Sequence, residues 1–108
     1  MPHAVTDTTW TDEVLLSDRP VLVNFTADWC PPCRKLKPIL HEIADELGDR
    51  VRVVTLDIDT SPNAARDYGV LSAPTLALFQ GGELVRAVVG LRPKRQILSM
   101  IEDALVPG

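Results

Sequence analysis

The chain has 108 residues, of which 45% are hydrophobic and 24% are charged, with a formal net charge of −4 and a sequence pI of about 5.0. This length suits one globular domain, so we expect residues 1–108 to form a single one. The acidic balance argues against a nucleic-acid partner, which requires a basic surface, and no basic amphipathic segment favours a membrane surface.

The first quarter of the chain predicts an edge strand, a helix and a buried strand. Residues 4–6 suit a short strand, and residues 7–9 offer N-caps for a helix that ends near Ser17. Arg19-Pro20 then interrupts the chain before "VLVNF" at residues 21–25. This apolar, β-branched run is too short for a helix and predicts a buried central strand.

A long amphipathic helix is predicted over residues 33–48. Its apolar residues recur at helical spacing and are Leu36, Ile39, Leu40, Ile43 and Leu47. Gly48 is the expected C-terminal stop. Pro38 lies inside the pattern and predicts a kink, because proline lacks an N–H and crowds the preceding turn.

The second half of the chain alternates strands and helices and then adds a hairpin. Residues 51–59 predict a strand, and Ser61-Pro62 predicts a capped helix that stops at Gly69. Residues 74–90 predict two strands around a glycine pair, and Pro93 opens a last amphipathic helix. The order β-α-β-α-β-α-β-β-α predicts an α/β fold, a central mixed sheet with helices on both faces.

Both cysteines of the chain lie in "WCPPC", where the buried strand gives way to the long helix. If Cys30 starts that helix, Cys33 is its neighbour on the same face, so the pair can form and break a disulfide. The helix N-terminus favours a thiolate on Cys30, which would attack, while Cys33 faces the interior and resolves. Pro31 and Pro32 suit the first helical positions, where a missing N–H costs nothing.

Two other interpretations of the cysteine pair remain open. C-x-x-C can be half of a zinc site, with His3 and His41 as the remaining candidate ligands. It can also be a purely structural disulfide, although such a short loop gains little stability from closure.

We expect no secretory signal and no membrane span, and therefore a cytoplasmic protein. Cysteine pairs in the cytosol are kept reduced and tend to be catalytic or metal-binding.

The chain resembles the thioredoxin family from about Val21 to the last helix. The motifs that carry the resemblance are "VLVNFTADWCPPC", "KPIL", "LDID", "SAPTLALF", "GGELV" and "VVG", in this order. The resemblance implies the thioredoxin fold. It also implies that Ala73-Pro74 is the family's cis-proline loop, and that Gly90 belongs to the third loop of its substrate groove.

The resemblance further implies a shallow apolar patch around Cys30 that binds substrates. Its members would be Trp29, Ala73, Pro74, Gly90 and Leu91. Three of them also have a plainer interpretation: Trp29 can be core, Pro74 can be an ordinary trans proline that opens a strand, and Gly90 can simply end a strand.

The chain departs from the family pattern near the cysteines. Pro31 replaces the usual glycine of the active-site loop, and Thr26 stands at a site that is often tryptophan. Asn24 stands where the family buries an aspartate, the supposed proton acceptor for the resolving thiol, and Thr55 where it often has a lysine. The two changes are consistent, because neither leaves an unpaired buried charge.

These implications predict a monomeric protein-disulfide reductase with no bound cofactor or metal. Its electrons would come from NADPH through a flavoprotein thioredoxin reductase, and its substrates would be disulfide-containing proteins. Pro31 and Asn24 keep open a more oxidising oxidase or isomerase, or a protein with one dedicated partner. A binding module that uses the fold without catalysis is a further alternative.

Overall fold

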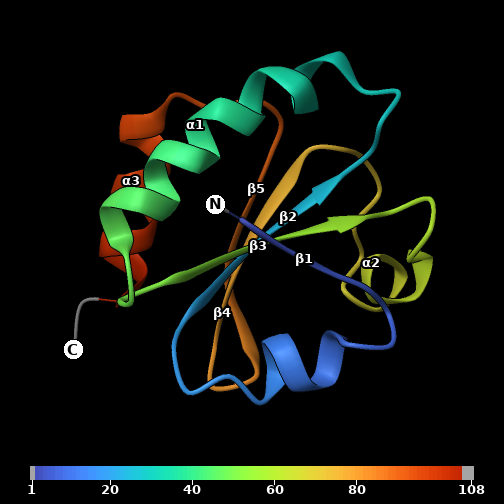
Figure 1. Ribbon diagram of the computed structural model, residues 1–108, viewed down its shortest axis with the longest axis horizontal. Helices are drawn as coiled ribbons and strands as arrows, with labels where there is room; N and C mark the ends of the chain where they lie inside the picture. The colour runs from blue at the N-terminus through green and yellow to red at the C-terminus, as the bar shows by residue number, and fades with distance from the viewer. Residues whose placement is uncertain (1, 106–108) are drawn as a thin grey trace.

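The computed structural model describes residues 2–105 and shows a five-stranded sheet with helices on both faces (Figure 1). The strands are β1 (His3–Val5), β2 (Val21–Thr26), β3 (Arg52–Asp57), β4 (Thr75–Gln80) and β5 (Glu83–Val89). The helices are α1 (Pro31–Leu47), α2 (Pro62–Asp67), α3 (Lys94–Leu105) and a short π-helical turn, η1 (Thr11–Leu15).

The sheet is mixed, with strand order β1-β3-β2-β4-β5. β1, β3 and β2 are parallel, whereas β4 runs antiparallel to β2 and β5 antiparallel to β4. The β4–β5 turn needs positive φ at both central residues, and Gly81 and Gly82 have φ of 61° and 82°. The predicted fold class is confirmed, and β2 is the central strand.

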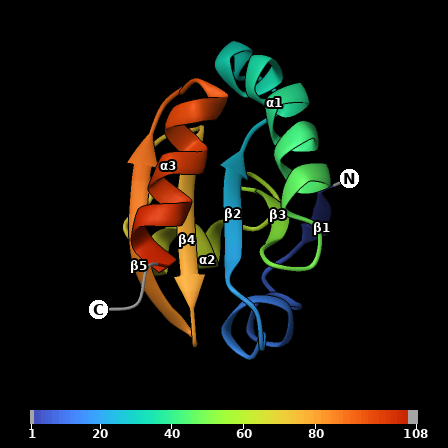
Figure 2. The ribbon, with the colours of Figure 1, turned by 90° about the vertical axis from the view of Figure 1, so that its left-hand side faces the viewer.

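Two apolar cores lie on opposite faces of this sheet. α1 and α3 cover one face and α2 covers the other (Figure 2). Because successive residues of a strand point to opposite faces, Val21, Val23 and Phe25 join the core on the α2 side. Leu22 joins the core under α1 and α3. Asn24, between Val23 and Phe25, therefore faces α1.

The first predicted helix is present as a short π-helical turn that ends at Leu15, close to the predicted end near Ser17, but its N-cap is Trp10 and not one of residues 7–9. η1 covers only five residues, and the N–H of Leu16 donates to the carbonyl oxygen of Thr11 at 2.9 Å, the i→i+5 pattern of a π-helix. It is held by tertiary packing rather than by its own length, since Trp10 and Val14 are buried. The Trp10 ring lies 5.3 Å from the Phe79 ring between centroids.

α2 receives its N-terminal cap from a residue far away in the sequence. Ser61 precedes α2 as predicted, but its side chain makes no capping bond within the helix. The carboxylate of Asp7 instead accepts the N–H groups of Asn63 and Ala64, each at 3.0 Å. Ser61 Oγ in turn accepts the N–H of Asp7 at 3.2 Å. This exchange ties the segment after β1 to α2.

We expect Asp7→Ala to lower the free energy of unfolding by about 1–2 kcal/mol, the usual cost of losing a capping side chain. The substitution leaves two helix N–H groups without their acceptor. Urea unfolding followed by circular dichroism measures the change. Asp103→Ala, an exposed site on α3, is the control and should stay within about 0.5 kcal/mol of wild type. Equal stability of the two variants would contradict the capping role.

α1 and α3 are joined by a charged contact as well as by their shared core. Lys94 Nζ donates to Glu46 Oε1 and lies 3.7 Å from Glu42 Oε1. The hydrogen bond to Glu46 is the main reason that the pKa of Lys94 is raised. α1 also contains Pro38 in its interior and ends at Gly48, where φ is 54°; the kink expected at Pro38 stays a prediction.

Candidate active site

The two cysteines lie where β2 gives way to α1. Cys30 is the N-cap residue of α1, with extended backbone dihedrals, and Pro31 and Pro32 occupy the first two helical positions. The prolines therefore take sites whose N–H groups have no partner within the helix, as expected. Cys33 follows in the first turn, with its Cα atom 5.2 Å from that of Cys30, and the two sulfur atoms form a disulfide.

The start of α1 directs positive potential at Cys30. The backbone N–H of Cys33 donates to Cys30 Sγ at 3.2 Å, so the sulfur acts as the capping acceptor of the helix. Unpaired N–H groups at a helix N-terminus and the helix dipole both favour negative charge there. A thiolate on Cys30 is thus stabilised in the reduced protein, and the thiolate is the nucleophilic form.

Exposure does not distinguish the two cysteines in this disulfide form. Cys30 is 2% exposed and Cys33 is 4% exposed. Cys33 faces the interior as predicted, but Cys30 is also covered. Cys30 packs with Ala27 and Ala73, and its Sγ lies 3.4 Å from the carbonyl oxygen of Ala73.

The loop that covers Cys30 contains a cis peptide bond between Ala73 and Pro74, as the resemblance implies. The carbonyl oxygen of Pro74 accepts the N–H of Gly90 at 2.8 Å. Gly90 directly follows the end of β5 and has φ of 93°, a conformation that side-chain-bearing residues rarely adopt. Three segments that are distant in sequence are thereby brought together beside the disulfide.

Trp29 and Leu91 present apolar surface near this junction. Trp29 is 62% exposed, so the interpretation of this residue as core is wrong, and Leu91 is 41% exposed. The Trp29 indole N–H donates to Asp59 Oδ2 at 2.7 Å. Asp59 was not predicted from the sequence as a site residue. Its only signal was its place in "LDID", directly after the strand that runs beside β2.

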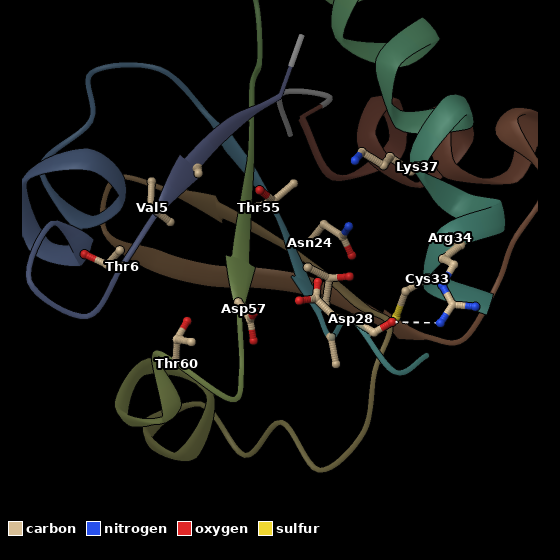
Figure 3. Close-up of a pocket in the computed structure, with 13 residues that line it drawn as sticks. Val5, Thr6, Asn24, Asp28, Cys33, Arg34, Lys37, Thr55, Asp57 and Thr60 are labelled. Atoms are coloured by element: carbon tan, nitrogen blue, oxygen red, sulfur yellow. Dashed lines mark hydrogen bonds between the residues drawn. The ribbon is translucent and has the colours of Figure 1, made fainter. Parts of the chain in front are cut away.

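Three of the positions that depart from the family pattern, Asn24, Thr26 and Thr55, meet beneath Cys33. Asn24 is 3% exposed, and Thr55 is its neighbour across the parallel β2–β3 pair. Both line a pocket of about 410 Å³ that Cys33 also borders, with Asp57 and Arg34 on its walls (Figure 3). Cys33 thus packs with the apolar Ala27 and Cys30 on one side and borders polar side chains in this pocket on the other, with no carboxylate at position 24.

Residues 2–105 contain no group of three or more histidine, cysteine, aspartate or glutamate side chains arranged to hold a metal ion. His3 contacts Glu13 at 3.3 Å, and His41 lies beside a second pocket with Lys37 and Leu40. Neither histidine is brought to the cysteines as the zinc interpretation requires. Within the same residues, every helix is too short or too polar to cross a membrane.

Comparisons with known proteins give one consistent family. The thioredoxin family model matches residues 1–103. Thioredoxin of Rickettsia felis is 44% identical over 105 residues, which cover 97% of this chain and all of that protein. Thioredoxin of Streptomyces clavuligerus is 48% identical over 94 residues, 87% of each chain. A bifunctional thioredoxin reductase/thioredoxin of Mycobacterium leprae is 45% identical over 94% of this chain, which covers 22% of that longer protein.

These matches span nearly the whole chain, and the disulfide at the start of α1 supplies the chemistry that they imply. They do not favour a non-catalytic binding module or a specialised oxidase. The chain therefore belongs to the thioredoxin family, and its activity is dithiol–disulfide exchange through Cys30 and Cys33.

Proposed function

We propose that this protein reduces disulfides of other proteins, with Cys30 as the attacking thiol and Cys33 as the resolving thiol. The hydrogen bond from the Cys33 N–H to Cys30 Sγ at the helix N-terminus carries this assignment, because it stabilises the thiolate on Cys30 alone. The sulfur of Cys33 does not receive this hydrogen bond, because the backbone nitrogen of Cys33 is the donor. The first thiol to react is therefore Cys30.

The reaction proceeds as two exchanges. The Cys30 thiolate attacks one sulfur of the substrate disulfide, forming a mixed disulfide and releasing the other sulfur as a thiolate. Cys33 then attacks Cys30 Sγ, which re-forms the Cys30–Cys33 bond and releases the second substrate sulfur. The substrate gains two electrons and the protein is left oxidised.

The substrate site is the surface around the cis-proline loop. Ala73 lies against Cys30, and the Gly90–Pro74 hydrogen bond fixes the adjoining loop beside it. Trp29 and Leu91 add exposed apolar area at the edge of this site. A partner backbone that pairs with residues 73 and 74 would hold its disulfide over Cys30, while Pro31 and Pro32, both exposed, limit its approach.

Electrons return to the protein from NADPH through a flavoprotein thioredoxin reductase. One relative carries a thioredoxin reductase and a thioredoxin in one chain, which supports this pairing. The chain itself needs no resident cofactor for thiol exchange. We further infer that residues 1–108 act as a single-domain, cytoplasmic monomer.

The reductase assignment predicts NADPH-dependent reduction of insulin disulfides. A catalytic amount of the protein, with NADPH and a bacterial thioredoxin reductase, should consume NADPH at a rate proportional to the concentration of this protein. The double variant Cys30→Ser/Cys33→Ser is the control and should give only the background of the reductase. Insulin reduction with dithiothreitol but none with NADPH and reductase would refute the electron source and leave the exchange chemistry standing.

A further inference from the structure

A pocket lined by several polar side chains lies beneath Cys33, on the face of the sheet that α1 covers. Its volume is about 410 Å³, and Cys33, Asn24, Thr55 and Asp57 are among the residues that line it (Figure 3). A water molecule occupies about 30 Å³ in the liquid, so the pocket has room for several. The inner cysteine thus borders space for water, although the residue is only 4% exposed.

The register of the sheet gathers the polar side chains of this pocket. Leu22 of β2 packs in the core under α1, so Asn24 and Thr26, two and four residues later, point to the same face. The parallel pairing sets Asn24 beside Thr55 and Thr26 beside Asp57. Polar residues of two adjacent strands therefore lie together where α1 begins.

Asn24 indicates that this pocket is hydrated. Within the described part of the chain its Oδ1 is a buried acceptor without a hydrogen-bond donor. A buried carbonyl oxygen left without a donor is costly, and water in a polar pocket is the usual remedy. A carboxamide can join such a network, but it cannot take up a proton.

The resolving step needs a group that can take up the proton of the Cys33 thiol. Cys33 must lose its proton before it can attack, because the thiolate is the nucleophile. Two carboxylates border the pocket, those of Asp28 and Asp57, and Arg34 and Lys37 bring positive charge from α1.

Asp57 is the less exposed of the two carboxylates, and its side chain is the one that a hydrogen bond holds. Asp28 is exposed on the loop before Cys30, and the guanidinium of Arg34 donates to its backbone carbonyl at 3.0 Å. Asp57 is half-buried at the end of a strand, and its Oδ1 accepts the N–H of Asp59 at 2.8 Å. The side chain of Asp57 is thus held in place beside the pocket.

We propose that Asp57 accepts the proton of Cys33, through pocket water, during the resolving step. The proposal rests on the proposed function, in which Cys33 attacks the mixed disulfide. The Cys33–Cys30 bond forms as the bond between Cys30 and the substrate sulfur breaks, and the electron pair leaves with that sulfur as a thiolate. The proton passes from Cys33 to Asp57 and then to solvent, so the step needs no other reactant.

Stopped-flow reaction of the reduced protein with 5,5′-dithiobis(2-nitrobenzoate) separates the two exchanges. Attack by Cys30 releases one coloured thiolate, and attack by Cys33 releases the second. Asp57→Asn should slow the second release about 100-fold near neutral pH, the lower range for a positioned base. The difference should shrink toward about pH 10, because a thiol with an ordinary pKa of about 8.5 then ionises without help.

Two further variants make the test specific. Asp57→Glu keeps a carboxylate and should restore most of the second release. Asp67→Asn makes the same charge change at the exposed end of α2 and should leave both releases unchanged. A normal second release in Asp57→Asn, a deficit of equal size at every pH, or an equal deficit in Asp28→Asn would each overturn the role of Asp57. Absence of the second release in the wild-type protein would instead refute the two-thiol function itself.

Discussion

Cys30→Ser should lower the rate of insulin disulfide reduction by about 10⁴-fold or more, on the scale seen when an enzyme that forms covalent intermediates loses its nucleophile. A serine hydroxyl has no accessible anionic form near neutral pH and does not exchange with disulfides. The remaining thiol, Cys33, is 4% exposed and lies in the first turn of α1. Insulin turbidity in dithiothreitol measures the loss against the uncatalysed rate.

This experiment decides which of the two cysteines attacks the substrate. Both cysteines are covered in the disulfide form, so exposure alone does not say which one attacks. The matched variant is Cys33→Ser, which removes the other thiol and leaves the Cys30 cap in place. A Cys30→Ser protein that still forms mixed disulfides, beside a Cys33→Ser protein that does not, would reverse the two roles.

Most of the fold was predictable from local patterns. The run at residues 21–25 is short, apolar and β-branched, and it forms the central strand of the sheet. The glycine pair at 81 and 82 forms the hairpin turn, and Gly48 ends α1. Such signals depend on neighbours in sequence, where backbone preference and hydrophobic spacing are decisive.

The features that were mispredicted or missed depend on contacts between distant residues. The cap of α2 comes from Asp7, 56 residues before Asn63, so a local reading assigns it to Ser61. Trp10 packs on Phe79 beside η1, a contact that no helical spacing reveals. The polar pocket needs the register that sets Thr26 beside Asp57, and the register appears only in the folded sheet.

In the active site, too, features set by neighbouring residues were predictable from the sequence, and contacts between distant residues were not. The cysteine pair and its place at a strand–helix junction follow from the sequence, since C-x-x-C and the helix start are adjacent. That Ala73 lies against Cys30 was expected only through family resemblance, because 43 residues separate them. Asp59 was missed for the same reason, although it fixes the exposed indole of Trp29.

Cys33→Ser should convert the protein from a turnover catalyst into a trap for its substrates. Cys30 keeps its hydrogen bond from the backbone N–H of residue 33, which does not depend on the side chain, so the first attack remains. Without the neighbouring thiol, the mixed disulfide can be released only by an external thiol in a slower bimolecular step. Mass spectrometry after exposure to glutathione disulfide should show about one glutathione per chain, bound at Cys30.

Under the same conditions we expect the wild-type protein to form its internal disulfide and to retain no glutathione. Proximity is the physical reason, since the Cα atoms of the two cysteines lie 5.2 Å apart and their thiols meet without moving the backbone. Cys33→Ser turning over as fast as wild type, with no adduct, would show that one thiol suffices. The placement of two cysteines on one turn of α1 would then be unnecessary for the reaction, and the proton acceptor assigned to Cys33 would have no step to serve.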